Sequence, residues 1–256
     1  MTSDWFIRVV AALIGAAIGS FLNVCIYRLP AGESVVQPRS RCPRCGLQIG
    51  WRDNIPVLSY LLLRGRCRGC GVRISPQYPL VELASALIWL AAVVRHGVAW
   101  QALAVAVFFT LLLGIALTDA RTYIIPDEFT LGGALAGVAL SVAPGGVTLA
   151  QSLLGAGVGF GLLYLAGMMG EWWLKKPAMG GGDIKMMAMV GAFLGPIGAI
   201  LAIFFGALSG SIVFLPITLK TRKLVPFGIF LAVGAAVAQG WGDLIVGWYT
   251  TTYLGG

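Results

Sequence analysis

The stretch VAWQALAVAVFFTLLLGIALT, residues 98–118, decides the fold of this chain. It holds no charged residue and can cross ~30 Å of hydrocarbon as an α-helix, which takes ~20 residues. Its apolar residues are continuous rather than alternating, so a membrane helix is favoured over a strand of a barrel. Asp119 follows directly, at a depth where a carboxylate is costly unless it has a partner or a function.

The whole chain has the composition of an integral membrane protein. Of its 256 residues, 58% are hydrophobic and 11% are charged, whereas a soluble domain has roughly a quarter charged residues. The net charge of +8 could suggest a nucleic-acid partner, but the basic residues cluster between the apolar runs. That pattern is typical of membrane proteins with cytoplasmic basic loops. We therefore expect an all-α polytopic bundle in a lipid bilayer, and no nucleic acid.

About eight apolar segments are expected to be transmembrane helices. They cover residues 5–27, 79–94, 98–118, 129–142, 149–174, 184–194, 197–219 and 225–248. The sixth is too short to cross unaided, so we expect it to be broken or partly re-entrant. Asn23, a polar residue in the first segment, is expected to face the bundle.

These segments divide the chain into three predicted parts. They are a first transmembrane helix at 1–27, a cytoplasmic cysteine-rich domain at 28–78 and a membrane-embedded domain at 79–256. With both termini outside, 16 of the 18 lysines and arginines fall in inner loops, and only Arg8 and Arg95 fall outside. The opposite orientation would export nearly all of them, against the positive-inside rule.

Four cysteines form two CxxC knuckles. They are Cys42-Pro43-Arg44-Cys45-Gly46 and Cys67-Arg68-Gly69-Cys70-Gly71. Four thiolates supplied from two turns match tetrahedral zinc coordination, while placement on the reducing side disfavours the alternative of disulfides. We expect Cys42, Cys45, Cys67 and Cys70 to bind one structural zinc ion. Cys25, within the first segment, is expected to be a small buried hydrophobe.

Asp183 is the second acid at the end of an apolar run, in Gly180-Gly181-Gly182-Asp183-Ile184-Lys185. If Asp119 and Asp183 meet, both cannot ionise cheaply, so one keeps its proton while the other acts as a base. Such a pair could activate water for attack on a peptide carbonyl. The alternative, that each acid only caps a helix or marks an interface, stays open. The three glycines before Asp183 do not decide between the two, because about one glycine triplet is expected by chance in this glycine-rich chain.

Other functions are restricted by the single histidine, His96. It is not part of an HExxH motif, which excludes a zincin-type metalloprotease, and it lies at the outer end of a segment. A membrane-anchored zinc module that scaffolds a secretion assembly remains open. So does a transporter with a proton relay, although the sequence shows no clear internal repeat and places both acids at the membrane edge.

From Gly19 to Phe230 the chain resembles the type IV prepilin leader peptidases, also called prepilin peptidase/N-methyltransferases, of the GxGD class of membrane aspartyl proteases. The resemblance rests on both knuckles and on the segments around Asp119 and Asp183. It also rests on Gly19-Ser20-Phe21-Leu22-Asn23-Val24, Tyr27-Arg28-Leu29-Pro30, Asp53-Asn54-Ile55-Pro56-Val57-Leu58-Ser59-Tyr60, Tyr78-Pro79-Leu80-Val81-Glu82 and Pro226-Phe227-Gly228.

The resemblance implies an aspartyl endopeptidase of the bacterial inner membrane with Asp119 and Asp183 as its catalytic pair. It implies cleavage of the short basic leader of type IV pilins and related pseudopilins at the cytoplasmic face. N-methylation of the new N-terminus with S-adenosylmethionine follows. In the family a glycine before the second knuckle matters for methyl transfer, and this glycine falls on Gly65, which we expect at the cofactor.

Two positions depart from the family pattern. Arg121 stands where members often carry a second acid, and it is expected to change the local electrostatics. Ile229 stands where a proline often follows Pro-Phe-Gly. Asp127 is expected to act as an N-terminal acid of the fourth segment, outside the catalytic pair.

Overall fold

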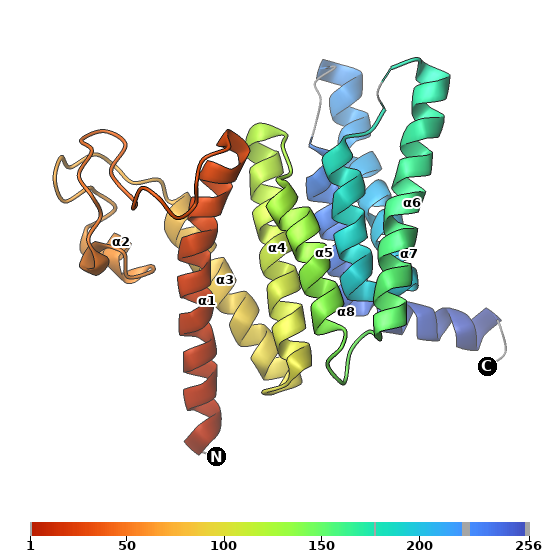
Figure 1. Ribbon diagram of the computed structural model, residues 1–256, viewed down its shortest axis with the longest axis horizontal. Helices are drawn as coiled ribbons and strands as arrows, with labels where there is room; N and C mark the ends of the chain where they lie inside the picture. Colours follow the sequence, from red (N-terminus) through yellow and green to blue (C-terminus); the bar gives the residue numbers. More distant parts are fainter. Residues whose placement is uncertain (1, 177, 222–225, 254–256) are drawn as a thin grey trace. The chain divides into compact units, whose positions relative to one another are not determined.

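The computed structural model describes residues 2–176, 178–221 and 226–253 (Figure 1). The elements are α1 (Thr2–Arg28), η1 (Leu29–Ala31), η2 (Trp51–Asp53), α2 (Leu58–Leu62), α3 (Gln77–His96), α4 (Trp100–Thr122), α5 (Asp127–Leu140), α6 (Leu149–Leu174), α7 (Gly181–Thr221) and α8 (Phe227–Tyr253). Three residues used in the sequence argument lie outside the described part: Arg222 and Lys223 of an inner loop, and Val225 at the predicted start of the last segment.

The apolar segments predicted from the sequence coincide with helices. Within the described residues, six helices are long and apolar enough to cross a membrane, namely α1, α3, α4, α6, α7 and α8. The fourth predicted segment is α5, which has only 14 residues. The sixth and seventh both lie within α7. The prediction of an all-α, multi-pass membrane bundle is therefore confirmed.

The sixth segment was expected to be broken or partly re-entrant, but residues 184–194 form a continuous helical limb, and the interruption follows them at Gly195. Gly195 has non-helical angles, with φ 72° and ψ −177°, and it separates two helical limbs of α7. The local sequence explains the break, because glycine adopts positive φ without steric cost. Pro196 follows, and a proline cannot donate a backbone hydrogen bond to the preceding turn.

The two limbs of α7 run in opposite directions. A straight helix of 41 residues would be ~60 Å long. However, Thr221 at the end of α7 is only a short loop away from Phe227 at the start of α8. Gly182, near the start of α7, and Gly228, near the start of α8, both lie against Ile125. Both ends of α7 are therefore near one place, and the helix turns back at Gly195.

Contacts divide the chain into two compact units, Met1–Thr110 and Leu111–Gly256. In the first unit α1 packs along α3. Gly15 and Gly19 of α1 lie so close to α3 that a β-carbon on either would clash with it, the small-residue spacing that lets membrane helices approach closely. Asn23, expected to face the bundle, is buried, and its amide donates to the Tyr78 carbonyl at 3.0 Å.

The cysteine-rich segment between α1 and α3 has little regular structure beyond η1, η2 and α2. It is attached to α3 through Glu82, whose buried carboxylate accepts the backbone N–H of Val57 at 2.7 Å. Val57 has φ 61°, a conformation that β-branched residues rarely adopt. The bond from Glu82 therefore holds a strained position immediately before α2.

In the second unit, α7 packs against α5, α6 and α8. Gly155 and Gly159 of α6 touch the backbone of the first limb of α7, and the Ser152 hydroxyl donates to the Ala192 carbonyl at 2.7 Å. Five hydrophobic residues of this limb are fully buried: Met186, Met187, Met189, Val190 and Ala192. The limb that carries Asp183 is therefore fixed by close packing.

Candidate active site and cysteine cluster

Asp119 lies in the last turn of α4, and only 5% of its surface is exposed. The adjacent Thr118 hydroxyl donates to carbonyls of its own helix at 2.9 Å, so it does not bind the carboxylate. A carboxylate in such a place requires donors from elsewhere in the fold.

The first turn of α8 supplies these donors. The backbone N–H groups of Ile229 and Gly228 donate to the Asp119 carboxylate, and the positive end of the α8 dipole faces the acid. The Oδ2 atom of Asp119 is buried and has no hydrogen-bond partner within the described residues. One carboxylate oxygen is therefore available to a water molecule or a substrate.

Asp183 is the third residue of α7 and is half-buried. Its carboxylate accepts the backbone N–H of Gly180, as acids at the third helical position often do for the residue that caps the helix. A β-carbon on Gly180 would lie 3.0 Å from Oδ2 of Asp183. Asp183 thus caps its own helix, and the adjacent glycine allows the close approach.

Asp119 and Asp183 interact electrostatically, so two acids far apart in the sequence share one site. Ile125, which is buried, lies between their segments. A β-carbon on Gly182 would come 2.9 Å from the Ile125 side chain, and one on Gly228 would come 2.7 Å from it. Two adjacent carboxylates in an apolar setting are suited to general acid and base catalysis on a peptide bond.

The four predicted metal ligands also come together. The sulfurs of Cys42, Cys45, Cys67 and Cys70 all lie within 4.8 Å of one another. The Sγ atoms of Cys42 and Cys70 are 3.8 Å apart, and those of Cys45 and Cys67 are 3.9 Å apart. Four sulfurs at ~2.3 Å from one tetrahedral ion are about 3.8 Å apart. The cluster could therefore hold one metal ion.

Both knuckles are built by the same backbone hydrogen bonds. They join Cys42 to Leu47, Gly46 to Cys42, Cys67 to Val72 and Gly71 to Cys67, each at 2.9 Å. The backbone N–H groups of Cys45 and Arg44 lower the pKa of the Cys42 thiol to about 6. Burial and the neighbouring sulfurs raise the pKa of Cys45 to about 11, so the turn favours a thiolate at Cys42 and not at both cysteines.

A salt bridge connects the second knuckle to η2. The Arg68 guanidinium binds both carboxylate oxygens of Asp53, at 2.8 and 2.6 Å. The hydrogen bonds from Arg68 lower the pKa of Asp53, so this acid stays ionised in the folded protein. A bidentate salt bridge of this kind fixes the relative orientation of the two side chains in addition to pairing their charges.

Two family models match parts of this chain. Residues 13–96 match the Bacterial Peptidase A24 N-terminal domain, and residues 106–215 match the Type IV leader peptidase family. A relative from Aeromonas hydrophila, named Prepilin leader peptidase/N-methyltransferase, is 34% identical over 98% of this chain and 96% of its own length. The chain belongs to the type IV leader peptidase family.

Two further members of the family have the same name. The one from Myxococcus xanthus is 41% identical over 84% of this chain and 64% of its own length. The one from Pseudomonas putida is 34% identical over 96% of this chain and 94% of its own length. No solved structure matches the chain significantly.

In this leader peptidase, the departure at Ile229 has a structural meaning. Ile229 provides one of the N–H groups that reach Asp119, whereas the proline often found at this position in the family has no N–H to donate. Ile229 therefore adds a donor to the acid. Arg121, the other departure, is exposed, and its effect on the electrostatics stays a prediction.

Lys185 had no predicted role beyond its place in the motif around Asp183. The structure pairs its ammonium group with both carboxylate oxygens of Asp127, each at 2.8 Å. The pair links the first residue of α5 to a residue of α7 two positions after Asp183. Asp127 and Lys185 were visible in the sequence near Asp119 and Asp183, but their pairing depends on packing.

Gly65 has the backbone features expected of an obligatory glycine. Its φ is 66°, and a β-carbon there would come 2.9 Å from the ring of Tyr60. Its N–H donates to the Tyr60 carbonyl at 2.8 Å. Gly65 therefore shapes the turn before the second knuckle, and its predicted place at the methyl donor stays a prediction.

Proposed function

We propose that this protein is a membrane aspartyl endopeptidase that removes the leader peptide of type IV prepilins and pseudopilins, and then N-methylates the new N-terminus. The pairing of Asp119 with Asp183 among apolar helices carries the proposal. The name shared by the relatives supports both reactions and the substrate class.

In the peptidase reaction the two acids act as one unit. The ionised carboxylate takes a proton from water, whose oxygen attacks the scissile carbonyl, while the protonated acid polarises that carbonyl. Collapse of the intermediate breaks the C–N bond, and a proton from the pair goes to the leaving amine. The two carboxyl groups titrate as a pair. The reaction needs one of them protonated and the other ionised, so neither Asp119 nor Asp183 suffices alone.

We place the active site and the cysteine-rich domain at the cytoplasmic face of the bacterial inner membrane, with both termini outside. The concentration of basic residues in the loops on that side supports this orientation. A prepilin with a basic leader and an apolar helix would present its scissile bond at the inner interface. That is the depth of Asp119, at the end of α4.

We assign a structural zinc ion to Cys42, Cys45, Cys67 and Cys70, whose sulfur distances suit tetrahedral coordination. Four protein ligands leave no position for water, so the ion would hold the two knuckles together rather than catalyse. A domain of residues 28–78 is too small to rely on a hydrophobic core alone, and metal binding would supply folding energy.

We retain Gly65 as the residue expected at S-adenosylmethionine, the cofactor that would supply the methyl group. Tyr60 occupies the space beside its α-carbon. The cofactor could therefore contact only the backbone of Gly65, and not a cavity left by the missing side chain. The contribution of Gly65 would be the shape of the turn between α2 and Cys67.

The test is to incubate the purified protein with a synthetic prepilin, with and without S-adenosylmethionine, and to identify the products by mass spectrometry. Cleavage is expected in both cases, and methylation only with the cofactor. Asp119→Asn and Asp183→Asn should each abolish cleavage, and the double variant should be no worse than either. An uncut substrate with the wild type would favour a scaffold or a transporter, and substantial activity in either single variant would refute the shared-water mechanism.

A further inference from the structure

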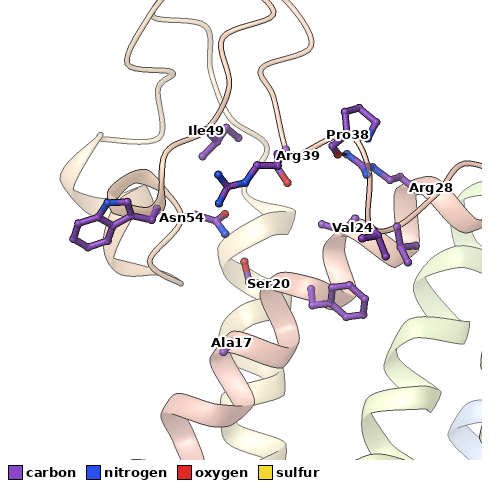
Figure 2. A pocket seen from close by; sticks show the side chains of 13 residues that line it. Ala17, Ser20, Val24, Arg28, Pro38, Arg39, Ile49 and Asn54 are labelled. Carbon is purple, nitrogen blue, oxygen red and sulfur yellow. Dashed lines mark hydrogen bonds between the residues drawn. The ribbon is translucent and has the colours of Figure 1, made fainter.

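The first unit contains a pocket of about 490 Å³ between α1 and the cysteine-rich segment (Figure 2). One wall is the C-terminal half of α1, which contributes Ala17, Ser20, Phe21, Val24 and Arg28. The other wall comes from the cysteine-rich segment, including Arg39, Ile49, Trp51 and Asn54. Neither the catalytic pair nor the cysteine cluster contributes to it.

The two ends of this pocket differ in chemistry. Ala17, Phe21 and Val24 are apolar and lie further from the end of the candidate membrane span Asp4–Ala31 than Arg28 does, so we expect this end of the pocket to lie beside hydrocarbon. The other end carries Arg28 and Arg39, and Figure 2 shows the Arg39 guanidinium extending toward Asn54 and the centre of the pocket. An occupant that fills both ends must be apolar at one end and polar at the other.

The polar end is cationic and has no acidic counterpart. The pocket lining contains no aspartate or glutamate. Arg28 is held in place by donating to the carbonyls of Ser34 and Pro38, both at 2.8 Å. In the described part of the chain, neither Arg28 nor Arg39 forms a salt bridge with a carboxylate. Two guanidinium groups therefore remain uncompensated at the rim.

We propose that this pocket binds an anionic phospholipid, with its phosphate at Arg39 and Arg28 and an acyl chain along Phe21 and Val24. Guanidinium groups bind phosphate oxygens through paired hydrogen bonds, and basic pockets beside membrane helices suit anionic headgroups. A bound lipid would connect α1 to the cysteine-rich segment. This site goes beyond the proposed peptidase and methyltransferase activities and does not depend on them.

Two other occupants fit the pocket less well. S-adenosylmethionine carries a sulfonium, an ammonium and one carboxylate, so its net charge is positive and two uncompensated arginines attract it less than they attract an anion. The leader of a prepilin is basic, so the arginines repel it. A soluble anion would satisfy the arginines but would leave the Phe21 end of the pocket unfilled.

The test is lipid binding to the purified full-length protein in a neutral detergent, measured by native mass spectrometry. Phosphatidylglycerol is expected to bind at lower concentration than phosphatidylcholine, and glycerol 3-phosphate is expected not to displace it. Arg39→Gln should weaken phosphatidylglycerol binding about fivefold or more, the factor expected for one basic residue near an anionic lipid. Phe21→Gln, at a half-exposed position, should also weaken it, because the change removes an apolar contact to the acyl chain.

The matched control is Arg73→Gln, which removes the same charge from an exposed residue of the cysteine-rich segment outside the pocket. This variant should bind phosphatidylglycerol within twofold of the wild type. Equal weakening by Arg73→Gln and Arg39→Gln would show a general charge effect and overturn the proposal. So would equal binding of both lipids by the wild type, or full displacement by glycerol 3-phosphate, which would indicate a site for soluble anions.

Discussion

The α-carbon of Gly228 lies directly against the carboxylate of Asp119. A β-carbon on this glycine would come 2.8 Å from Oδ2 of the acid and 2.7 Å from the Ile125 side chain. The first turn of α8 can therefore donate its N–H groups to Asp119 only because residue 228 has no side chain. This contact gives a physical reason for the Pro226-Phe227-Gly228 motif.

Gly228→Ala should reduce cleavage about 100-fold, the scale of a small displacement of a catalytic group. Alanine is the better helix former, so a loss of activity would be caused by displacement of Asp119 rather than by weakening of α8. The matched control is Gly240→Ala on the same helix, where a β-carbon meets open space. Product formation by both variants should be measured at equal protein level, and near-normal cleavage by Gly228→Ala would contradict the role of this contact.

Lys185→Gln and Asp127→Asn should each lower kcat about tenfold and change KM little, because the pair positions the start of α7 without touching the substrate. Both side chains are partly exposed, so the effect on stability should be small. The double variant should be no worse than the single ones, since both remove one interaction.

Glu128→Gln provides the control for this pair, since Glu128 is the next residue and is also exposed. It should keep wild-type kcat. A reversed pair, Asp127→Lys with Lys185→Asp, should recover part of the lost rate. Additive losses in the double variant, or an equal loss in Glu128→Gln, would rule out a positioning role.

One zinc ion per chain should copurify with the protein, and Cys42→Ser or Cys67→Ser should lose it. Without the ion, residues 28–78 should become sensitive to protease, because metal binding and folding are coupled in such small domains. Cys25→Ala, in α1, should keep the metal. Less than ~0.2 zinc per chain in carefully prepared wild type would count against a zinc site.

Gly65→Ala should reduce methylation strongly while cleavage continues. Alanine is strained at φ 66°, and its β-carbon would displace Tyr60, whereas Asp119 and Asp183 lie in the other unit. Gly50→Ala is the control, because Gly50 has open space and ordinary φ. The assay scores cleaved and cleaved-and-methylated peptide separately. Equal loss of both products, with the metal still bound, would indicate one shared site.

Hydrophobic run length and cysteine spacing predicted much of this fold and the gathering of the four cysteine sulfurs. Long apolar runs leave a membrane chain few alternatives to helix, and glycine followed by proline marked the break in α7. Each CxxC turn brings its own two sulfurs together, and the spacing typical of a metal site predicted that the two pairs would meet. The sequence also placed Asn23 correctly toward the bundle, where it binds the Tyr78 carbonyl.

Contacts between distant elements could not be predicted in this way. Apolar runs define where a helix lies but not how it is rotated about its axis. The bond from Val57 to Glu82 and the pair of Asp127 with Lys185 depend on that rotation. The approach of Gly228 to Asp119 depends on α7 turning back, which brings the start of α8 to the acid.

The first limb of α7, residues 181–194, is about 21 Å long at ~1.5 Å per residue. The hydrocarbon layer is ~30 Å thick, so this limb is subject to hydrophobic mismatch. A bilayer adapts to a short hydrophobic segment by becoming thinner around it, which brings the lipid headgroups closer to the membrane centre. The 14 residues of α5 require the same adjustment next to the same acids. Peptide hydrolysis would then take place in a local dimple of the membrane, which water can enter without crossing the full hydrocarbon layer.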